Sequence, residues 1–268
     1  MINPTELKPE ILFLSFISSK RKERIGFIEH TALIFQASGH FTLETAGERT
    51  SMQQGEIMLV KKNQLGEITK LPLEGQQYQT IVILLKEELL RKIALQERIE
   101  NVPKYSGPSN ILIPANDYLQ GFFQSVIPYV LHADQEITQA LGIFKVREAV
   151  KLLLHTHPGL RDFLFDFSEP HKVDLEKFML NNFQFNIPLE KFAILTGRSM
   201  AGFKRDFKKT FNMPPRQWLL EIRLNEARHL IEKKNGKSSS IYLDLGFESL
   251  SHFSSSFKKK FGKSPTAW

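Results

Sequence analysis

Residues 195–218 of this 268-residue chain read LTGRSMAGFKRDFKKTFNMPPRQW, and residues 245–268, 50 positions further on, read LGFESLSHFSSSFKKKFGKSPTAW. Nine of the 24 aligned positions are identical, and three of the nine are phenylalanines spaced four residues apart. Unrelated segments share far fewer residues in register, so the match indicates two copies of one supersecondary unit. We therefore expect the last hundred residues to contain a duplicated structure.

Each copy predicts a short helix, a tight turn and a second helix. Gly197 and Gly246 stand where the short helix must end, and glycine accepts the positive φ of a helix C-cap. Ser199 and Ser249 are placed to cap the second helix, whose phenylalanines form one apolar stripe. This arrangement is the helix-turn-helix, whose second helix enters the major groove of DNA. A helix over residues 218–231 is predicted to connect the copies.

The outward face of each second helix holds the candidate DNA-binding residues, because the phenylalanines face inward. Arg205 is the best candidate for guanine recognition, since its planar fork matches guanine O6 and N7. Residues near the helix start can reach base edges, whereas later lysines lie near phosphates. The first copy presents Met200, Ala201, Lys204, Arg205 and Lys208. The second copy presents Leu250, Ser251, Ser254, Ser255, Lys258 and Lys259.

The charge of the chain is concentrated in the same region. Residues 170–268 contain 18 Lys and Arg against 9 Asp and Glu, a net charge of +9. The first 169 residues contain 18 and 20, a net charge of −2. A basic third on a slightly acidic body favours a polyanionic partner, although a solvated lysine-rich surface would have the same composition.

Three strings resemble the DNA-binding domain of the AraC/XylS family over roughly residues 172–268. They are RLNEAR at 223–228, LDLGF at 243–247 and FKKKFGKSP at 257–265. The resemblance implies that both second helices enter successive major grooves on one face of double-stranded DNA. It also implies RNA polymerase as a partner.

The resemblance assigns particular residues to base reading. In the first copy they are Ala201, Lys204 and Arg205, and in the second they are Leu250, Ser251 and Ser254. Family members often carry Gln near position 250 and Arg near position 255, where this chain has Leu250 and Ser255. The second unit is therefore expected mainly to grip the backbone or to contact thymine methyl groups.

The first part of the chain predicts an antiparallel sandwich or small barrel, because short β-type runs alternate with turn residues. A hairpin turn is expected at Ala46–Glu48, between Phe41–Thr45 and Arg49–Met52, and further turns are expected at Gly55, Gly66 and Gly75. The expected strands are Phe13–Ile17, Thr31–Gln36, Phe41–Thr45, Ile57–Val60 and Thr80–Leu85. A helix begins near Lys86, residues 101–113 are expected to be a loop, and helices are expected at about 116–133 and 135–156.

The predicted fold class is α+β. The family resemblance implies that the N-terminal domain, residues 1–168, is a cupin-like antiparallel β-barrel (about 10–86) followed by a helical dimerisation segment (about 87–167). The second domain, residues 169–268, is all-α with two helix-turn-helix units. In the later N-terminal helix, Ile137, Leu141, Phe144, Ala149, Leu152 and Leu153 form an apolar stripe. That helical pair could pack on the barrel or on a second copy, as in a homodimer.

The layout of the N-terminal domain is similar to that of the AraC/XylS branch that controls type III secretion. This resemblance implies a sensor and dimerisation domain that docks proteins. From the residues alone, the effector could be a small molecule or a protein.

Catalytic and metal chemistry is not indicated. The chain has no cysteine, and His30 and His40 are too separated to form a cupin metal set with Glu44. His155 and His157 point apart on a predicted helix. We therefore predict a protein that is not an enzyme and has no cofactor and no metal.

No segment indicates secretion or a membrane. The first ten residues lack a basic stretch followed by an apolar run, and no apolar run approaches the roughly 18–20 residues that span a bilayer. A cytoplasmic location and no membrane partner are therefore predicted.

The leading hypothesis is a sequence-specific transcription regulator, an activator, controlled through its N-terminal domain. One alternative is a cupin-type enzyme with a DNA-binding tail, which would contain a bound transition metal. Another is an architectural protein that binds DNA without sequence preference. The repeat argues against the last, because two major-groove helices at fixed spacing suit a defined site.

Overall fold

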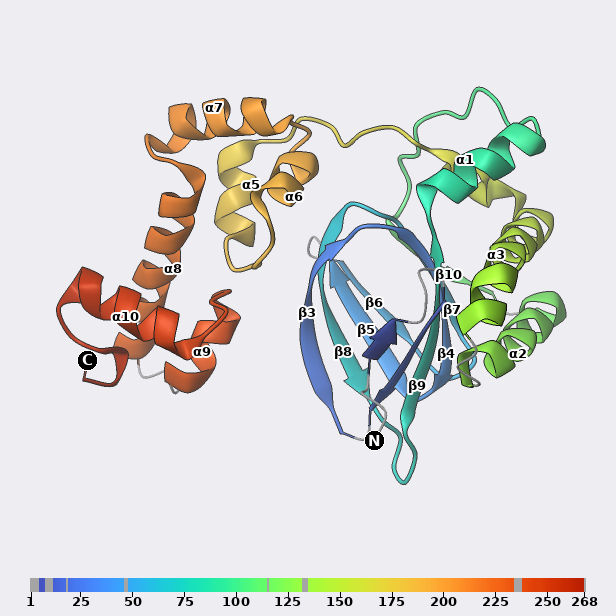
Figure 1. Ribbon diagram of the computed structural model, residues 1–268, viewed down its shortest axis with the longest axis horizontal. Coiled ribbons are helices and arrows are strands. Elements are labelled where there is room, and N and C mark those ends of the chain that lie inside the picture. Colours follow the sequence, from blue (N-terminus) through green and yellow to red (C-terminus); the bar gives the residue numbers. More distant parts are fainter. Residues whose placement is uncertain are drawn as a thin grey trace. The chain divides into compact units, whose positions relative to one another are not determined.

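The computed structural model describes residues 5–7, 12–17, 19–45, 48–114, 116–131, 135–233 and 238–267. The chain forms two compact units, Met1–Ser168 and Glu169–Trp268. The first unit is built on antiparallel strands with accompanying helices, and the second is helical (Figure 1). The predicted α+β class is confirmed.

The strands of the N-terminal unit form two antiparallel sheets. The larger has the order β1 (Thr5–Leu7), β2 (Leu12–Ile17), β9 (Tyr78–Leu85), β4 (Thr31–Ser38), β7 (Ile57–Val60) and β10 (Asn110–Ile113). The smaller has the order β3 (Arg21–Ile28), β8 (Gln64–Leu71), β5 (His40–Thr45) and β6 (Glu48–Met52). Among the described residues the strands thus make two open sheets instead of one continuous barrel.

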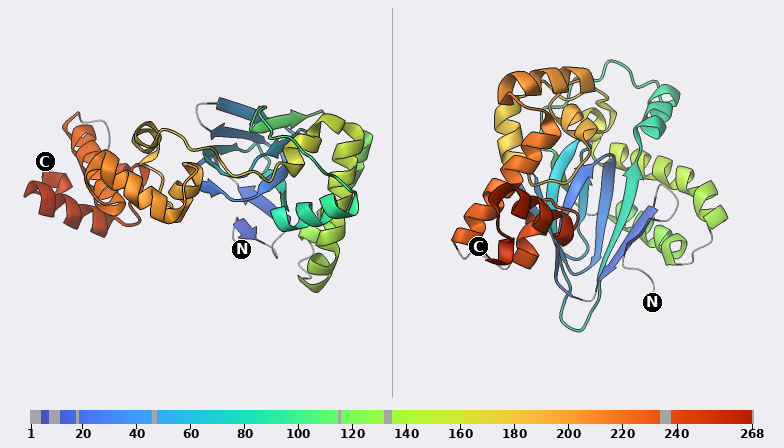
Figure 2. Two further views of the ribbon diagram at one scale, coloured as in Figure 1. Left: turned by 90° about the horizontal axis from the view of Figure 1, so that it is seen from above. Right: turned by 60° about the vertical axis from the view of Figure 1, so that its left-hand side comes forward.

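Strand β4 shows how the layers are built. Successive side chains of a strand point to opposite faces. Ala32 and Ile34 face the smaller sheet and share a core with Leu43 of β5, whereas Leu33 and Phe35 face the other way and pack against helices. Both faces of the strand are therefore buried, which explains its continuous apolar run. Figure 2 shows the helices beside the larger sheet.

The helices of this unit cover the outer face of the larger sheet. They are α1 (Glu87–Gln96), α2 (Asp117–Leu131), α3 (Gln135–Thr156), the 3-10 turn Pro158–Leu160 and α4 (Arg161–Phe165). Phe123 of α2 is fully buried and its ring stacks on Phe35 at 4.7 Å between centroids. The two long helices were predicted and are confirmed. Within the described part of the chain, no helix is long and apolar enough to cross a membrane.

The predicted apolar stripe of α3 is only partly right. Ala149 and Leu153 are buried, but Leu141 and Phe144 are 36% and 64% exposed. The side chain of Ile137 lies outside the described residues. The sheet contact instead selects positions spaced i, i+3, i+4 and i+7, which are Val146, Ala149, Val150 and Leu153.

The loop predicted for residues 101–113 is wrong at its end. Asn110–Ile113 forms β10, which pairs with β7 so that Asn110 stands opposite Val60. The Asn110 side-chain amide also donates to the hydroxyl of Thr45 at 2.7 Å. Four residues are too few to show a period, so only their pairing reveals the strand.

The turn predicted at Gly66 is also wrong, because this residue lies inside β8. A Cβ atom there would lie 2.9 Å from the Thr45 side chain and 3.0 Å from that of Leu43. Glycine is needed for a close approach of strands, a meaning it can have within a sheet. Gly55 and Gly75 do lie in turns, each with positive φ.

In the smaller sheet, two strands were predicted and two were missed. The expected hairpin joins β5 and β6, which pair antiparallel, although its turn residues Ala46 and Gly47 lie outside the described part. Strands β3 and β8 were not predicted. Strand β3 begins with four charged residues, RKER at 21–24, so its sequence does not show the apolar alternation that predicts a strand.

The C-terminal unit consists of helices around two small cores. They are α5 (Leu175–Asn182), α6 (Leu189–Leu195), α7 (Met200–Phe211), α8 (Pro215–Glu232), α9 (Ser238–Asp244), α10 (Leu250–Phe261) and the 3-10 turn Pro265–Ala267. Residues of α8 contribute to both cores, Trp218 to the first and Leu224 to the second. Helix α8 is the connecting helix that the sequence predicts.

A buried carboxylate ties together the end of the N-terminal unit. Asp166 follows α4 and accepts hydrogen bonds from the ammonium of Lys61 at 2.8 Å and from the backbone amides of Tyr105 and Ser168 at 3.2 and 3.0 Å. Burial alone would raise the pKa of Asp166, but the hydrogen bonds from Lys61 and Ser168 outweigh it and lower the pKa to about 2.

We expect this carboxylate to make the N-terminal unit sensitive to acid. A lowered pKa means stability that is fully present above the unfolded value of about 4 and is lost as the pH falls towards 2. Asp166→Asn should therefore lower the free energy of unfolding by about 2 kcal/mol at pH 7 and flatten this acid dependence. Urea unfolding followed by circular dichroism at several pH values measures both.

Asp162→Asn, at a half-exposed position on α4, is the matched control and should change little. An Asp166→Asn variant with the acid dependence of the unsubstituted protein would contradict the assignment.

Candidate nucleic-acid interface

The turn of the first helix-turn-helix unit depends on a glycine. Gly197 follows α6 with a φ of +64°, in the left-handed region. A Cβ atom at this position would lie 2.4 Å from the backbone of His171, so no other residue fits without a shift. Thr196 is fully buried and its hydroxyl donates to the carbonyl oxygen of Phe192 at 2.9 Å, which closes the end of α6.

Helix α7 begins and packs as its sequence predicts. The Ser199 hydroxyl accepts a hydrogen bond from the Gly202 amide at 3.2 Å, a side-chain cap of the first turn. Phe203 and Phe207 are fully buried. The Phe207 ring also lies 5.5 Å from the Trp218 ring of α8, edge to face. These contacts fix which face of α7 remains outside.

The second unit repeats this construction. Ser249 caps α10 by accepting from the His252 amide at 3.2 Å, and Gly246 ends the preceding turn with a φ of +78°. Phe253 and Phe257 are fully buried in the second core. The structural equivalence of the two copies therefore matches their sequence identity.

Arg223 of α8 joins the two units. Its Nε donates to the carbonyl oxygen of Phe183 at 2.7 Å, and its two Nη atoms donate to those of Phe185 and Gly246 at 2.9 and 3.0 Å. Phe183 and Phe185 precede α6, whereas Gly246 belongs to the second turn. Burial lowers the pKa of Arg223 to about 10, so it stays charged at neutral pH.

A close backbone contact accompanies this bridge. A Cβ atom on Gly246 would lie 2.4 Å from the carbonyl oxygen of Gln184. The glycine thus serves both the turn and the joint between units. Sequence reasoning used Arg223 only as part of a motif, and nothing in the local sequence distinguishes it from the other charged residues of α8.

The predicted residues of the first unit lie where expected, with one exception. Met200 is half-buried and packs against the first core. The exposed members on α7 are Ala201, Lys204, Arg205 and Lys208. They share the side of the helix opposite its phenylalanines, so they are available to a ligand.

The second unit presents a less charged surface. Leu250 is 43% exposed at the start of α10, and Ser254 is half-buried. The other predicted residues, Ser251, Ser255, Lys258 and Lys259, are exposed. The start of this helix therefore offers hydroxyls and an apolar side chain, and its end offers ammonium groups.

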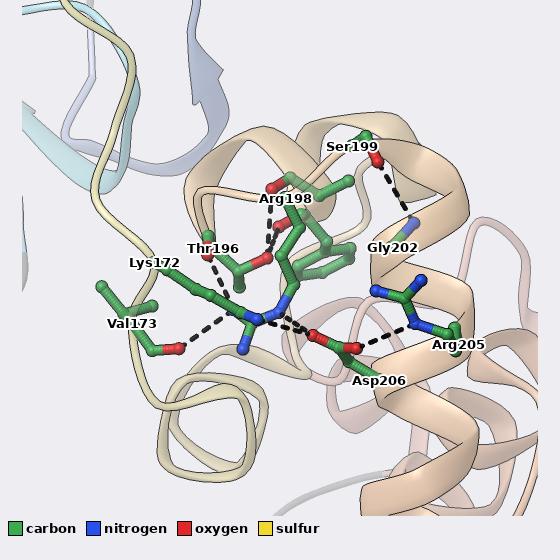
Figure 3. Close-up of polar contacts among 10 residues, drawn as sticks. Lys172, Val173, Thr196, Arg198, Ser199, Gly202, Arg205 and Asp206 are labelled. Atoms are coloured by element: carbon green, nitrogen blue, oxygen red, sulfur yellow. Dashed lines mark hydrogen bonds and ion pairs between the residues drawn. The ribbon is translucent and has the colours of Figure 1, made fainter.

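An ion-pair cluster that the sequence did not indicate lies beside α7 (Figure 3). The Asp206 carboxylate accepts from Nε of Arg198 at 3.1 Å and lies 3.2 Å from the Lys172 ammonium. Arg198 also donates to the carbonyl oxygens of Val173 and Thr196 at 3.0 and 2.7 Å. The cluster ties α7 to the turn before it and to the segment that precedes α5.

Across the described residues, no group of three or more His, Cys, Asp or Glu side chains is placed to hold a metal ion. The histidines and Glu44 considered above therefore do not assemble into such a group there.

Two helix-turn-helix units on one helical domain, each with the outer face of its second helix exposed, define a DNA-binding regulator of transcription. A family model described as a helix-turn-helix domain matches residues 192–268, and one described as the ExsA N-terminal regulatory domain matches residues 31–163. The chain belongs to the AraC/XylS family, and the resemblance seen in its sequence is confirmed.

Individual relatives agree with this assignment. The HTH-type transcriptional regulator ExsA of Pseudomonas aeruginosa is 24% identical over 235 residues, which cover 85% of this chain and 82% of that protein. The thermoregulatory protein LcrF of Yersinia pestis is 36% identical over 94 residues, 34% of each chain. The crystal structure of an apo ToxT variant from Vibrio cholerae shares the fold, with a TM-score of 0.50 at 10% identity and 97% of both chains covered.

Removal of the Arg223 bridge should loosen the DNA-binding domain. We expect Arg223→Met to lower its free energy of unfolding by about 3 kcal/mol, because three carbonyl oxygens lose a charged donor. Thermal unfolding followed by tryptophan fluorescence reports on this domain, since both tryptophans lie within residues 169–268.

Arg228→Met is the matched control, because Arg228 lies on the same helix and pairs with Glu232 at the surface. It should cost less than about 1 kcal/mol. Equal effects of the two substitutions would contradict the bridging role.

Proposed function

We propose that this regulator activates transcription by placing α7 and α10 in successive major grooves on one face of the DNA. The observation that carries the proposal is the Arg223 bridge, which holds two capped second helices in one domain. Activation is supported by a further relative, the virulence regulon transcriptional activator VirF of Yersinia enterocolitica, which is 36% identical over 94 residues. An activator of this kind acts in the cytoplasm and contacts RNA polymerase.

The first unit supplies most of the base recognition. Ala201, Lys204 and Arg205 are exposed on the first turns of α7, the part of such a helix that reaches base edges. Arg205 presents its guanidinium to guanine, and Lys208, one turn further on, lies at the phosphates. Met200 supports the helix from its inner side.

The second unit contributes mainly backbone contacts and weaker base recognition. Leu250 contacts thymine methyl groups, and the hydroxyls of Ser251, Ser254 and Ser255 bond to bases or sugars. Lys258 and Lys259 neutralise phosphates.

The N-terminal unit regulates this activity by binding another protein. The space between its sheets is filled by side chains such as Met52, Met58 and Tyr78, each with no exposed area. An effector therefore binds on the surface, where proteins dock, in preference to a small molecule within the fold.

The same unit forms a homodimer through α3. Phe144 is 64% exposed and Ile143 43% exposed, while the opposite side of the helix is buried on the sheet. Large apolar side chains gathered on one helix are typical of an interface.

Two substitutions separate base reading from phosphate contact. Arg205→Ala should cost about 1–3 kcal/mol of binding free energy at the preferred site and relax the preference at one base pair. Lys258→Ala should weaken binding to all duplexes and reduce the salt dependence by about one counterion. Selection from a randomised duplex library, followed by affinity measurements at several salt concentrations, tests both. If Arg205→Ala kept the preferred site and its affinity, α7 would not read DNA through this residue.

Dimerisation has its own test. Phe144→Glu should convert a dimer into a monomer in analytical ultracentrifugation, because it places a charge in an apolar contact. Leu95→Glu, at an 81% exposed position on α1, is the control and should not change the mass. A wild-type protein that remains monomeric at high concentration would refute the interface.

A further inference from the structure

We propose that Asp206 is a positioning residue for DNA reading, which orients the Arg205 guanidinium and is itself held by Arg198 and Lys172. The inference rests on the proposed function, since it takes Arg205 as a base reader. It adds a specificity determinant that does not itself face the bases, and it links base reading to the segment that enters the DNA-binding domain.

The carboxylate of Asp206 has a fixed place. Arg198 reaches it at 3.1 Å from the turn before α7, and this arginine side chain is only 9% exposed. Lys172 reaches the same oxygen, Oδ2, at 3.2 Å. Hydrogen bonds from Lys172 and then from Arg198 lower the pKa of Asp206, so the group is ionised at neutral pH.

The other carboxylate oxygen faces the proposed reader. Oδ1 of Asp206 lies 3.5 Å from Nε of Arg205, whose side chain is 79% exposed (Figure 3). An arginine has five N–H donors, and Nε carries one of them. When the carboxylate engages Nε, the two terminal nitrogens are left for the O6 and N7 atoms of one guanine.

The helix surface leaves room for this orientation. Side chains of an α-helix lean towards its N-terminus, so Arg205 lies over the preceding turn. There, Gly202 has no side chain, and a Cβ atom on it would be 3.9 Å from Nη2 of Arg205. The guanidinium therefore extends towards the start of α7, the part of the helix that reaches base edges.

The residues that hold Asp206 include part of the segment through which the chain enters the DNA-binding domain. Lys172 and Val173 immediately precede α5, and the Val173 amide donates to the carbonyl oxygen of Thr196 at 3.3 Å. The backbone of His171 lies so close to Gly197 that a Cβ atom there would clash at 2.4 Å. A change in this entry segment would therefore alter the support of Asp206 and, through it, of Arg205.

The test uses the full chain and duplexes that differ at single base pairs of the selected site. Arg205→Ala first identifies the base pair that this residue reads. Asp206→Asn keeps the side-chain shape and removes the charge. It should lower discrimination at that same base pair about threefold, because an exposed ion pair contributes modestly. Lys172→Gln should act in the same direction and less strongly, since Arg198 still holds the carboxylate.

Glu176→Gln is the matched control, because it removes one negative charge from an exposed position on α5 and leaves α7 intact. It should not change base discrimination. Asp206→Glu, which restores the charge, should recover part of the lost discrimination, a result that a purely structural defect would not give.

Two results would overturn the proposal. If Asp206→Asn weakened binding to every duplex equally, or left discrimination unchanged at the base pair read by Arg205, Asp206 would have no positioning role while Arg205 remained a reader. If Arg205→Ala altered no base preference, the reading assignment itself would fail, and the role of Asp206 would fail with it.

Discussion

The guanidinium of Arg223 is shared among three backbone carbonyl oxygens, two on the segment before α6 and one in the turn before α10. Helix α8 contributes residues to both cores and fixes the distance between them along its axis. The three charge-assisted bonds further restrict rotation about that axis, because donors in a planar fork accept only one arrangement of their partners. The separation and orientation of the two second helices therefore depend on this partly buried cation together with the two cores that α8 joins.

The two helix-turn-helix copies share the same backbone construction but differ in the side chains that they expose. Both use a serine cap, a glycine in the turn and fully buried phenylalanines. The outer face of α7 carries Lys204 and Arg205, whereas the start of α10 carries Leu250 and serines. Two similar units with different exposed faces suit an asymmetric DNA site made of two blocks of base pairs. In the proposed function, α7 reads the bases of one block, and α10 mainly contacts the backbone of the other.

The sequence predicts what depends on neighbouring residues and misses what depends on distant ones. The caps, the turns at Gly197 and Gly246 and the inward phenylalanines follow from spacing and from the conformational freedom of glycine. The partners of Arg223 lie up to 40 residues away, so no local pattern reveals them. Strand β10 was not predicted and the buried face of α3 was predicted only in part for the same reason, since each is selected by contact with the larger sheet.

A spacing series tests the fixed joint most directly. The full chain would be titrated with its selected duplex and with duplexes in which two or five base pairs are inserted between the two blocks. If Arg223 fixes the separation of α7 and α10, five inserted base pairs, about half a helical turn, should lower the affinity at least tenfold, because the second unit then faces the wrong side of the duplex. Equal affinity at every spacing would show that the two units move independently and would contradict the bridging role of Arg223.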